Sequence, residues 1–313
     1  MDDVLTRLLP SRVSIREVGP RDGLQSEPPI PTEAKIQLVD ALSATGVGRI
    51  EVTSFVHPKA VPQLADAEQV WAGIQRRPGV RYSALVANRR GAERALDAGC
   101  QELAVVVSAS ETHNRVNVRR SVEESLADIR EIVRFVHGRG GQCHVTISTA
   151  WGCPYEGDID PSRVAAIARR VCDDGADGLS LGDTTGMATP RRVWSLVEAL
   201  RDAVGDVPLN LHFHDTRGTG LANVLAALQV GVTDFDASIG GLGGCPYAPG
   251  AAGNIATDEL VAMLDDMGIE TGVDLAALLA AAERAEQLLG RTLPSRLLRI
   301  GPRTRLVPIE TAS

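Results

Sequence analysis

The segment HFHD places two histidines, His212 and His214, at the end of an apolar run with the composition of a strand. Side chains two residues apart in a strand point to the same face, so both imidazoles could bind one metal ion. An isolated pair of this kind is more often formed by ordinary polar residues at a strand end. Because the chain has only six histidines and two of them form this pair, we favour the metal site.

Two oxygen-bearing side chains elsewhere in the sequence could complete such a site. Asp22 lies in GPRDGLQ directly after a strand-like run, and Asn254 lies just before the helical pattern that begins in NIATDEL. Asn254 could instead be a helix N-cap, and Asp22 could form a surface ion pair with Arg21. Two imidazoles and two oxygens, without a thiolate, favour Mg²⁺ or Mn²⁺ over structural zinc.

Two further charged residues could act on a substrate. The guanidinium group of Arg21 can hold an anionic group. Glu51 lies inside the strand-like run RIEVTS, and it points inward if Ile50 and Val52 face the helices. Buried glutamates are rare unless they are paired, and Arg21 is the natural partner. A structural ion pair and a catalytic role both remain open for Glu51.

An aspartate and a cysteine lie at two other turns. Asp183 ends the strand-like run SLGD, where it could hold a ligating histidine or a bound water in place, or cap a turn. Cys245 lies in GGLGGCPYAPGAAGN, residues 240–254, which has too much glycine for a helix or a strand. This raises the question of why so loose a segment carries a thiol, and taken alone the cysteine is more simply interpreted as incidental.

The elements that would position these residues alternate regularly along the chain. Segments of helical period, such as TEAKIQLVDALSA and SVEESLADIREIVRFVHG, separate short β-rich runs. The β-rich runs are VSIREV (13–18), RIEVTS (49–54), VRYSALV (80–86), ELAVVV (102–107), CHVTIS (143–148), GLSLGD (178–183), PLNLHFHD (208–215) and DFDASI (234–239). This alternation predicts parallel pairing of the strands.

Eight such units over about 250 residues are the size of a closed (β/α)₈ TIM barrel. An open doubly wound sheet is the alternative, but no G-x-G-x-x-G motif opens the first helix. We expect one catalytic domain over residues 1–313, with the barrel at about 12–268 and a C-terminal extension with a short extra helical region at about 269–313. In a barrel, the active-site groups lie at the carboxyl ends of the strands.

Composition excludes several classes of function. The net charge of −8, with mixed signs, and the 3% aromatic content argue against a nucleic-acid partner. Five scattered cysteines contain no C-x-x-C pair, which predicts a reduced, cytoplasmic protein rather than a disulfide framework. No apolar run reaches the roughly 18 residues of a membrane helix, and the first residues do not resemble a signal peptide, so we expect no membrane partner.

Taken together, the motifs resemble a known enzyme family. EVGPRDGLQ, IEVTSFVHPK, GCPYEGDI, SLGDTTG, HFHDT and GGLGGCPYAPGAAGNIATDEL are similar to those of 3-hydroxy-3-methylglutaryl-CoA lyases, which are metal-dependent barrel enzymes related to 2-isopropylmalate synthases. The resemblance runs from about residue 12 to 290, and its glycine-cysteine stretch distinguishes the lyases from the synthases.

The resemblance implies a divalent cation, Mg²⁺ or Mn²⁺, and cleavage of an acyl-CoA substrate to acetyl-CoA and acetoacetate or a homologous 3-oxo acid. It also implies a role in leucine catabolism and ketone-body formation, and a homodimer or higher homo-oligomer. A condensing transferase that joins an acyl-CoA to a 2-oxo acid, or a related aldolase, is the alternative within the wider group. A non-catalytic barrel that binds an acyl-CoA or a protein is a third possibility.

Individual site residues follow from the same resemblance. It implies the metal ligands Asp22, His212, His214 and Asn254; the catalytic residues Arg21, Asp22, Glu51, His212 and Cys245; and substrate contacts by Arg21, Gln25, Asn117 and Asp183. The chain departs from the family where QSEP follows the Arg-Asp motif, where NVRR (117–120) replaces Asn-x-Asn-Cys, and at Arg217, where tyrosine is common. These departures lie where substrate identity could be set.

Overall fold

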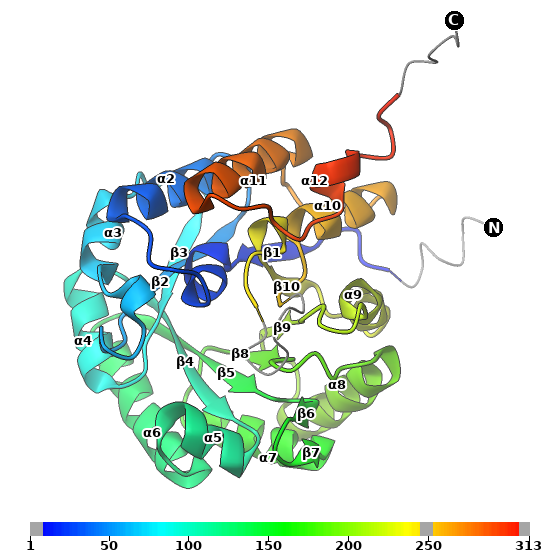
Figure 1. The fold of residues 1–313 in the computed structure, drawn as a ribbon. Helices are drawn as coiled ribbons and strands as arrows, with labels where there is room; N and C mark the ends of the chain where they lie inside the picture. The colour runs from blue at the N-terminus through cyan, green and yellow to red at the C-terminus, as the bar shows by residue number, and fades with distance from the viewer. Residues whose placement is uncertain (1–8, 245–252, 307–313) are drawn as a thin grey trace, which may run out of the picture.

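The computed structural model describes residues 9–244 and 253–306. Within them, eight parallel strands form a closed barrel in the order β1-β10-β9-β8-β5-β4-β3-β2 (Figure 1). The strands are β1 (Ser14–Glu17), β2 (Arg49–Ser54), β3 (Arg81–Leu85), β4 (Glu102–Ser108), β5 (Gln142–Ser148), β8 (Gly178–Gly182), β9 (Leu209–His212) and β10 (Asp234–Ala237). The predicted TIM barrel is confirmed, and each strand lies within the run expected for it or differs by one residue.

A helix follows each barrel strand and lies on the outside of the barrel. These helices are α2 (Thr32–Ser43), α3 (Ala67–Gly73), α4 (Arg89–Asp97), α6 (Val122–Gly138), α7 (Pro161–Asp173), α8 (Pro190–Val204), α9 (Gly220–Gln229) and α10 (Thr257–Asp266). After α10, the expected extension contains α11 (Leu275–Leu289) and the short α12 (Leu297–Ile300). That the whole chain is one domain stays a prediction.

Several smaller elements were not predicted from the sequence. They are the π-helical turn η1 (Gly19–Gly23), the 3₁₀ turns η2 (Pro62–Leu64) and η3 (Ile239–Gly241), the short helix α5 (Glu111–Val118) and the hairpin of β6 (Gly152–Cys153) and β7 (Gly157–Asp158). All except η2 directly follow barrel strands or the turns that leave them. They therefore shape the face of the barrel at the carboxyl ends of its strands.

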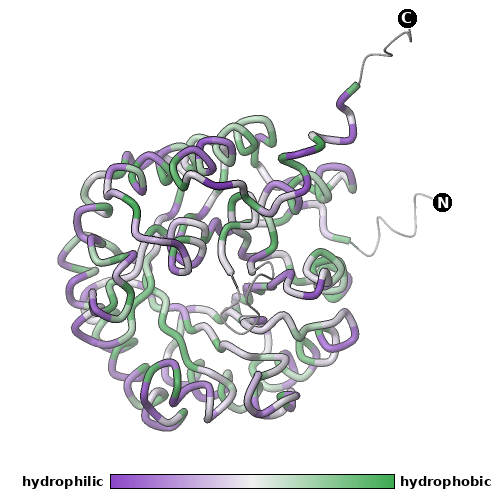
Figure 2. The backbone as a smooth tube through the Cα atoms, viewed as in Figure 1, coloured by the Kyte–Doolittle hydropathy of each residue, from purple (hydrophilic) through white to green (hydrophobic). Residues whose placement is uncertain are grey.

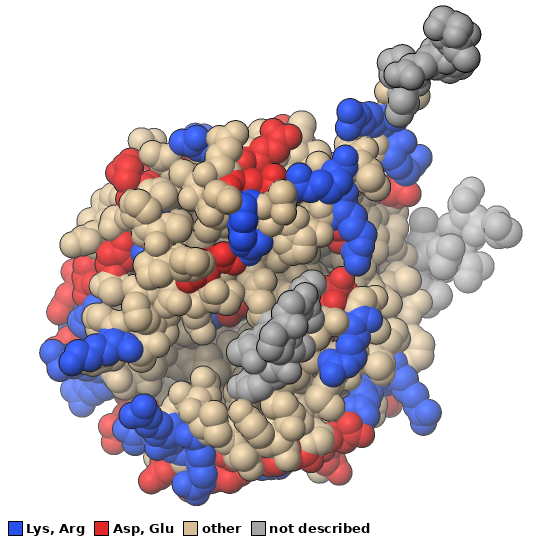
Figure 3. Space-filling view, viewed as in Figure 1, with Lys and Arg blue, Asp and Glu red and all other residues tan. Residues whose placement is uncertain are grey.

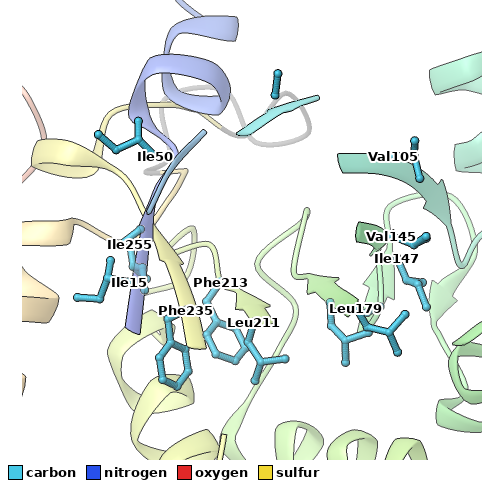
Figure 4. Packing of buried hydrophobic residues seen from close by; sticks show 14 of the residues in the cluster. Ile15, Ile50, Val105, Val145, Ile147, Leu179, Leu211, Phe213, Phe235 and Ile255 are labelled. Carbon is cyan, nitrogen blue, oxygen red and sulfur yellow. The ribbon is translucent and has the colours of Figure 1, made fainter. Parts of the chain in front are cut away.

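The hydrophobic core fills the space between the strands and the surrounding helices. Figure 2 shows hydrophobic residues along the strands and hydrophilic residues on the outer turns of the helices. Leu211, Phe213 and Phe235 belong to this core and are fully buried (Figure 4). Because side chains alternate along a strand, the residues between them, such as His212 and Asp236, point into the barrel. The barrel interior is therefore lined with polar groups.

Glu17, at the end of β1, joins the segments that carry the site. The backbone amides of Gly19 and Ile239 each donate a 2.8 Å hydrogen bond to Glu17 Oε1, and the Thr257 hydroxyl donates a 2.6 Å bond to Oε2. These partners belong to η1, η3 and α10. Burial raises the pKa of Glu17 from 4.5 to about 7, although the three hydrogen bonds oppose the shift.

The Glu17 shift predicts a pH-dependent stability. Because the folded pKa lies above the unfolded value, the folded state binds this proton more tightly, and stability is lost as the pH rises through about 7. The Glu17→Gln variant has no carboxyl proton to lose, so it lacks this pH-dependent loss of stability. The free energy of unfolding of this variant minus that of the wild type should therefore increase by about 3 kcal/mol between pH 4.5 and pH 8. Urea unfolding of both proteins at a series of pH values measures this difference in the free energy of unfolding. The other titrating groups are the same in both proteins, so their contributions cancel. A constant difference would contradict the prediction.

Among the helices in residues 9–244 and 253–306, none is both long enough and apolar enough to span a bilayer.

Candidate metal and catalytic site

Three candidate ligands converge at the carboxyl ends of the barrel strands. Asp22 lies in η1, His212 ends β9, and His214 follows two residues later. One ligand atom from each residue lies within 4.8 Å of the others. The two imidazole Nε2 atoms are 3.1 Å apart, and His212 Nε2 is 3.9 Å from Asp22 Oδ2. Segments distant in sequence are therefore brought together with the spacing of a cation site.

Asn254 lies beside this cluster. It forms an isolated antiparallel β-bridge with His214, and its Nδ2 donates hydrogen bonds to Asp22 Oδ2 (2.8 Å) and to the carbonyl of Leu242 (3.2 Å). The N-cap of α10 is Ala256, so Asn254 is not a helix cap. Its Oδ1 is buried and has no hydrogen-bond partner among the described residues. A buried amide oxygen without a donor suits a hard cation, so the residues present fit a divalent ion.

The charges of the cluster also suit a cation. Burial alone would raise the pKa of the Asp22 carboxyl, but Arg21, His212 and His214 together hold it well below its usual range. Burial, followed by the neighbouring His212, lowers the pKa of His214 to about 3, so its imidazole is neutral at neutral pH. A carboxylate and a neutral imidazole are the protonation states in which these side chains bind metals.

Arg21 connects two carboxylates at the edge of the cluster. Its Nε donates a 2.5 Å hydrogen bond to Glu51 Oε2, and its Nη1 donates a 2.5 Å bond to Asp22 Oδ1. Glu51 is fully buried on β2, next to an irregularity in the pairing of β2 with β3. The ion pair expected between Glu51 and Arg21 is therefore present, and it fixes the guanidinium group beside the candidate ligands.

Asp183 follows β8 and is buried. Its Oδ1 accepts hydrogen bonds from the amides of Met187 (2.8 Å) and Ala188 (2.9 Å), and its own amide donates to the carbonyl of His212 (2.8 Å). Burial raises the pKa of Asp183 to about 7, although these amides and the charge of His212 oppose the shift. Its Oδ2 is buried without a hydrogen-bond partner in the described residues. Asp183 thus caps a turn and leaves one oxygen unused.

The other expected site residues are placed differently. Gln25 lies just after η1 and Asn117 lies in α5; both are exposed, and neither belongs to the Asp22 cluster. Cys245 lies outside the described residues. The segments on either side of residues 245–252 are described, and both approach the site closely.

The glycines on these two segments are required by that approach. A Cβ on Gly243 would lie 2.8 Å from Asn254 Nδ2, and φ there is +126°. A Cβ on Gly253 would lie 2.8 Å from the backbone of Gly244. Side chains at these positions would displace Asn254 or separate the two segments, so the glycine-rich sequence allows the loop to begin and end against the candidate ligands.

Two residues that sequence reasoning missed support the cluster from below. Asp236 on β10 faces His212 Nδ1 at 3.1 Å and pairs with Arg16 on β1. Although burial opposes it, the hydrogen bond to Asp236, followed by the charge of Asp22, raises the pKa of His212. The sequence did contain a signal for Asp236: aspartates alternate in DFDASI, which was expected to form a strand of the barrel.

A closed parallel barrel with candidate ligands at the carboxyl ends of its strands is the arrangement of TIM-barrel enzymes. Within that class, the family model described as HMGL-like matches residues 12–284, and the chain belongs to this family.

Relatives are similar over nearly the whole chain. The Bacillus subtilis hydroxymethylglutaryl-CoA lyase YngG is 50% identical over 292 residues, which are 93% of this chain and 98% of YngG. A Pseudomonas aeruginosa 3-hydroxy-3-isohexenylglutaryl-CoA/hydroxymethylglutaryl-CoA lyase is 46% identical, covering 92% of this chain and 96% of the relative. The structure of an Acinetobacter baumannii HMG-CoA lyase in complex with coenzyme A and 3-methylmalate matches with a TM-score of 0.91 and 46% identity, covering 96% of this chain and 98% of that chain.

Proposed function

We propose that this protein is a divalent-metal-dependent carbon–carbon lyase. It cleaves 3-hydroxy-3-methylglutaryl-CoA, or a close 3-hydroxy-3-alkylglutaryl-CoA, to acetyl-CoA and acetoacetate or the homologous 3-oxo acid. The observation that carries the proposal is the convergence of Asp22, His212 and His214 within 4.8 Å. Membership of the HMGL-like family and the lyases among its relatives support the same reaction.

Asp22, His212, His214 and Asn254 would hold the cation. When bound, it would lower the pKa of the tertiary hydroxyl group of the substrate. Of the two candidate bases, Asp22 and His212, we assign the hydroxyl proton to a carboxylate oxygen of Asp22, because His212 Nδ1 faces Asp236 and its Nε2 is the atom left to bind the cation. Arg21, fixed by Glu51, stabilises the negative charge that develops as the carbon–carbon bond breaks.

The product side of the reaction needs a proton donor. The carbon–carbon cleavage yields a ketone and the enolate of acetyl-CoA, and the enolate takes up a proton at carbon. We assign this proton to the thiol of Cys245, whose loop begins and ends beside Asn254. A thiol is mostly protonated at neutral pH and can act as a general acid.

The acyl-CoA substrate class is supported by the coenzyme A bound to the relative from Acinetobacter baumannii. At the rim of the barrel face, a hollow of about 330 Å³ is lined by Asn88, Arg89, Arg90 and Arg120, together with Asp128 and Glu131. Figure 3 shows Lys and Arg side chains on this part of the surface, over α4 and α6. Arg120 pairs there with Asp128 at 3.1 Å and Arg89 lies over the Phe135 ring, and we propose the exposed Arg90 as a partner for the phosphates of a CoA thioester.

The length of the 3-alkyl branch is the least constrained part of the proposal. One relative is named for both isohexenyl and methyl substrates. The exposed Gln25 and Asn117 and the buried Asp183 are proposed substrate contacts, and Asn117 lies in the segment where this chain departs from the family motif. A homodimer or higher homo-oligomer and a cytoplasmic location complete the proposal; the four described cysteines are free, as a reduced compartment requires.

The test is acetyl-CoA release from a panel of 3-hydroxy-3-alkylglutaryl-CoA thioesters, with and without EDTA. We expect cleavage of at least the methyl substrate, its loss on chelation, and its recovery when Mg²⁺ or Mn²⁺ is added in excess. Cys245→Ala should retain cation binding and lose cleavage. Release of free CoA from acetyl-CoA and a 2-oxo acid would favour a condensing transferase, and no product from any thioester would refute the lyase.

A further inference from the structure

A buried ion pair lies directly beneath His212, inside the barrel. Arg16 Nε and Nη2 each donate a 2.8 Å hydrogen bond to Asp236, one to Oδ1 and one to Oδ2. The residues are only 5% and 3% exposed. The strand register places Arg16 opposite Asp236, and Asp236 opposite His212, on three neighbouring strands. The three side chains therefore form a continuous chain across β1, β10 and β9.

The contacts of Asp236 determine which nitrogen of His212 carries a proton. Its Oδ1 accepts from Arg16 and from Asn210 Nδ2 (2.9 Å), while its Oδ2 accepts from Arg16 and faces His212 Nδ1 at 3.1 Å. A carboxylate can only accept, so Nδ1 must be the donor of this contact. The Nε2 of a neutral His212 then has a free lone pair, and it is the atom that lies 3.1 Å from His214 Nε2.

We propose that Arg16 is a positioning residue: its two-point contact fixes the plane of the Asp236 carboxylate, which holds His212 with its proton on Nδ1 and its Nε2 directed at Asp22 and His214. The inference rests on the proposed cation site but not on the identity of the acyl-CoA. A guanidinium group suits this task because its planar fork matches a carboxylate at two points, whereas an ammonium group offers no such fixed geometry.

The barrel contains a second arginine–aspartate pair, which reaches Asp236 only indirectly: Asn210 Oδ1 accepts a 3.5 Å hydrogen bond from Arg49 Nη2, and Asn210 Nδ2 donates to Asp236. Arg49 Nη2 donates a 2.7 Å hydrogen bond to Asp234 Oδ1, and Arg49 lies opposite Arg16 in the register of β1 and β2. Asp234 is two residues before Asp236 on the same strand and pairs with Asn210 instead of His212. Asp234 is more exposed than Asp236, so Arg49 is the control for the loss of a barrel ion pair that does not contact His212 directly.

The test compares Arg16→Met, Arg16→Lys and Arg49→Met by Mn²⁺ titration calorimetry and by ¹⁵N NMR of the histidine rings without metal. Supporting partners of ligating histidines typically change metal affinity 10- to 100-fold. Arg16→Met should therefore weaken Mn²⁺ binding about 10- to 100-fold and shift His212 from a single Nδ1-protonated form to a mixture of tautomers. Arg16→Lys should recover part of the affinity, and Arg49→Met should stay within about twofold of the wild type.

Kinetics and a second variant complete the experiment. Arg16→Met should lower kcat about 10-fold or more while KM for the acyl-CoA stays within about twofold. Wild-type affinity and tautomer in Arg16→Met, or an equal loss in Arg49→Met, would overturn the proposal. If Arg16→Met does not fold, the double variant Arg16→Met/Asp236→Asn leaves neither charge of the buried pair and should weaken Mn²⁺ binding to the same extent; unchanged binding there would also overturn the proposal. If the wild type binds Mn²⁺ but cleaves no thioester, the lyase proposal fails and this one stands.

Discussion

Asp22→Asn is expected to lower kcat about 10³- to 10⁴-fold and to weaken divalent-cation binding by at least about 100-fold. The substitution keeps the size of the side chain but removes the charge that attracts Arg21, His212 and His214. It also removes a candidate base and the only carboxylate of the three converging ligands. Steady-state acetyl-CoA release and calorimetric titration with Mn²⁺ measure the two effects on the same preparation.

A surface aspartate provides the control for this substitution. Asp97 is exposed and, within residues 9–244 and 253–306, pairs only with Arg139 on the outside of the barrel, so Asp97→Asn should leave both cation binding and kcat within about twofold. Circular dichroism of both variants checks that the barrel is intact. Cation binding by Asp22→Asn with wild-type affinity would mean that the three residues converge for another reason.

Arg21→Lys is expected to lower kcat about 10²- to 10³-fold while divalent-cation affinity changes only a few-fold. The guanidinium group contacts Glu51 through Nε and Asp22 through Nη1, both at 2.5 Å. A lysine ammonium group retains the charge but cannot direct donors at two carboxylates and at developing negative charge from one fixed plane. Parallel measurement of kcat, KM and Mn²⁺ affinity separates loss of transition-state stabilisation from loss of the cation.

A double-mutant cycle with Glu51→Gln tests whether Glu51 acts through Arg21. If Glu51 acts through Arg21, the fold decrease in kcat of the double variant Arg21→Lys/Glu51→Gln should be much smaller than the product of the fold decreases of the two single variants. The second substitution then has no fixed guanidinium group left to disturb. Multiplicative losses would indicate that Glu51 has a role of its own. Arg21→Lys with a wild-type kcat and a raised KM would assign Arg21 to substrate binding alone.

Much of this fold was predictable because its signals are local and repeated. Each barrel strand is a short apolar run between helical patterns, and the run at 49–54 matches β2 at both ends. The run at 208–215 was expected to be one strand, but β9 ends at His212 and His214 bridges to Asn254 instead. Backbone hydrogen bonds from Ile255 to the Phe213 carbonyl and from Asp215 to the Gly253 carbonyl form this bridge, and no period in the sequence encodes it.

The site could be predicted only in part. Asp22, His212 and His214 follow strand-like runs, so the rule that barrels hold their chemistry at the carboxyl ends of strands was sufficient to group them. Arg16 and Asp236 lie within strands, where that rule gives no signal. Their role depends on the register between β1, β10 and β9, which is set by closure of the barrel and not by either segment alone.

The hydrogen bond between Asn254 and Asp22 joins residues 232 positions apart. A chain still emerging from the ribosome therefore cannot form the complete ligand set until its last barrel strand has paired with its first. An ion that binds only the closed barrel opposes opening of the whole molecule, and at a free concentration 100 times its Kd it would add about 2.7 kcal/mol to the free energy of unfolding. The thermal unfolding midpoint of the protein should consequently rise with the concentration of free divalent cation.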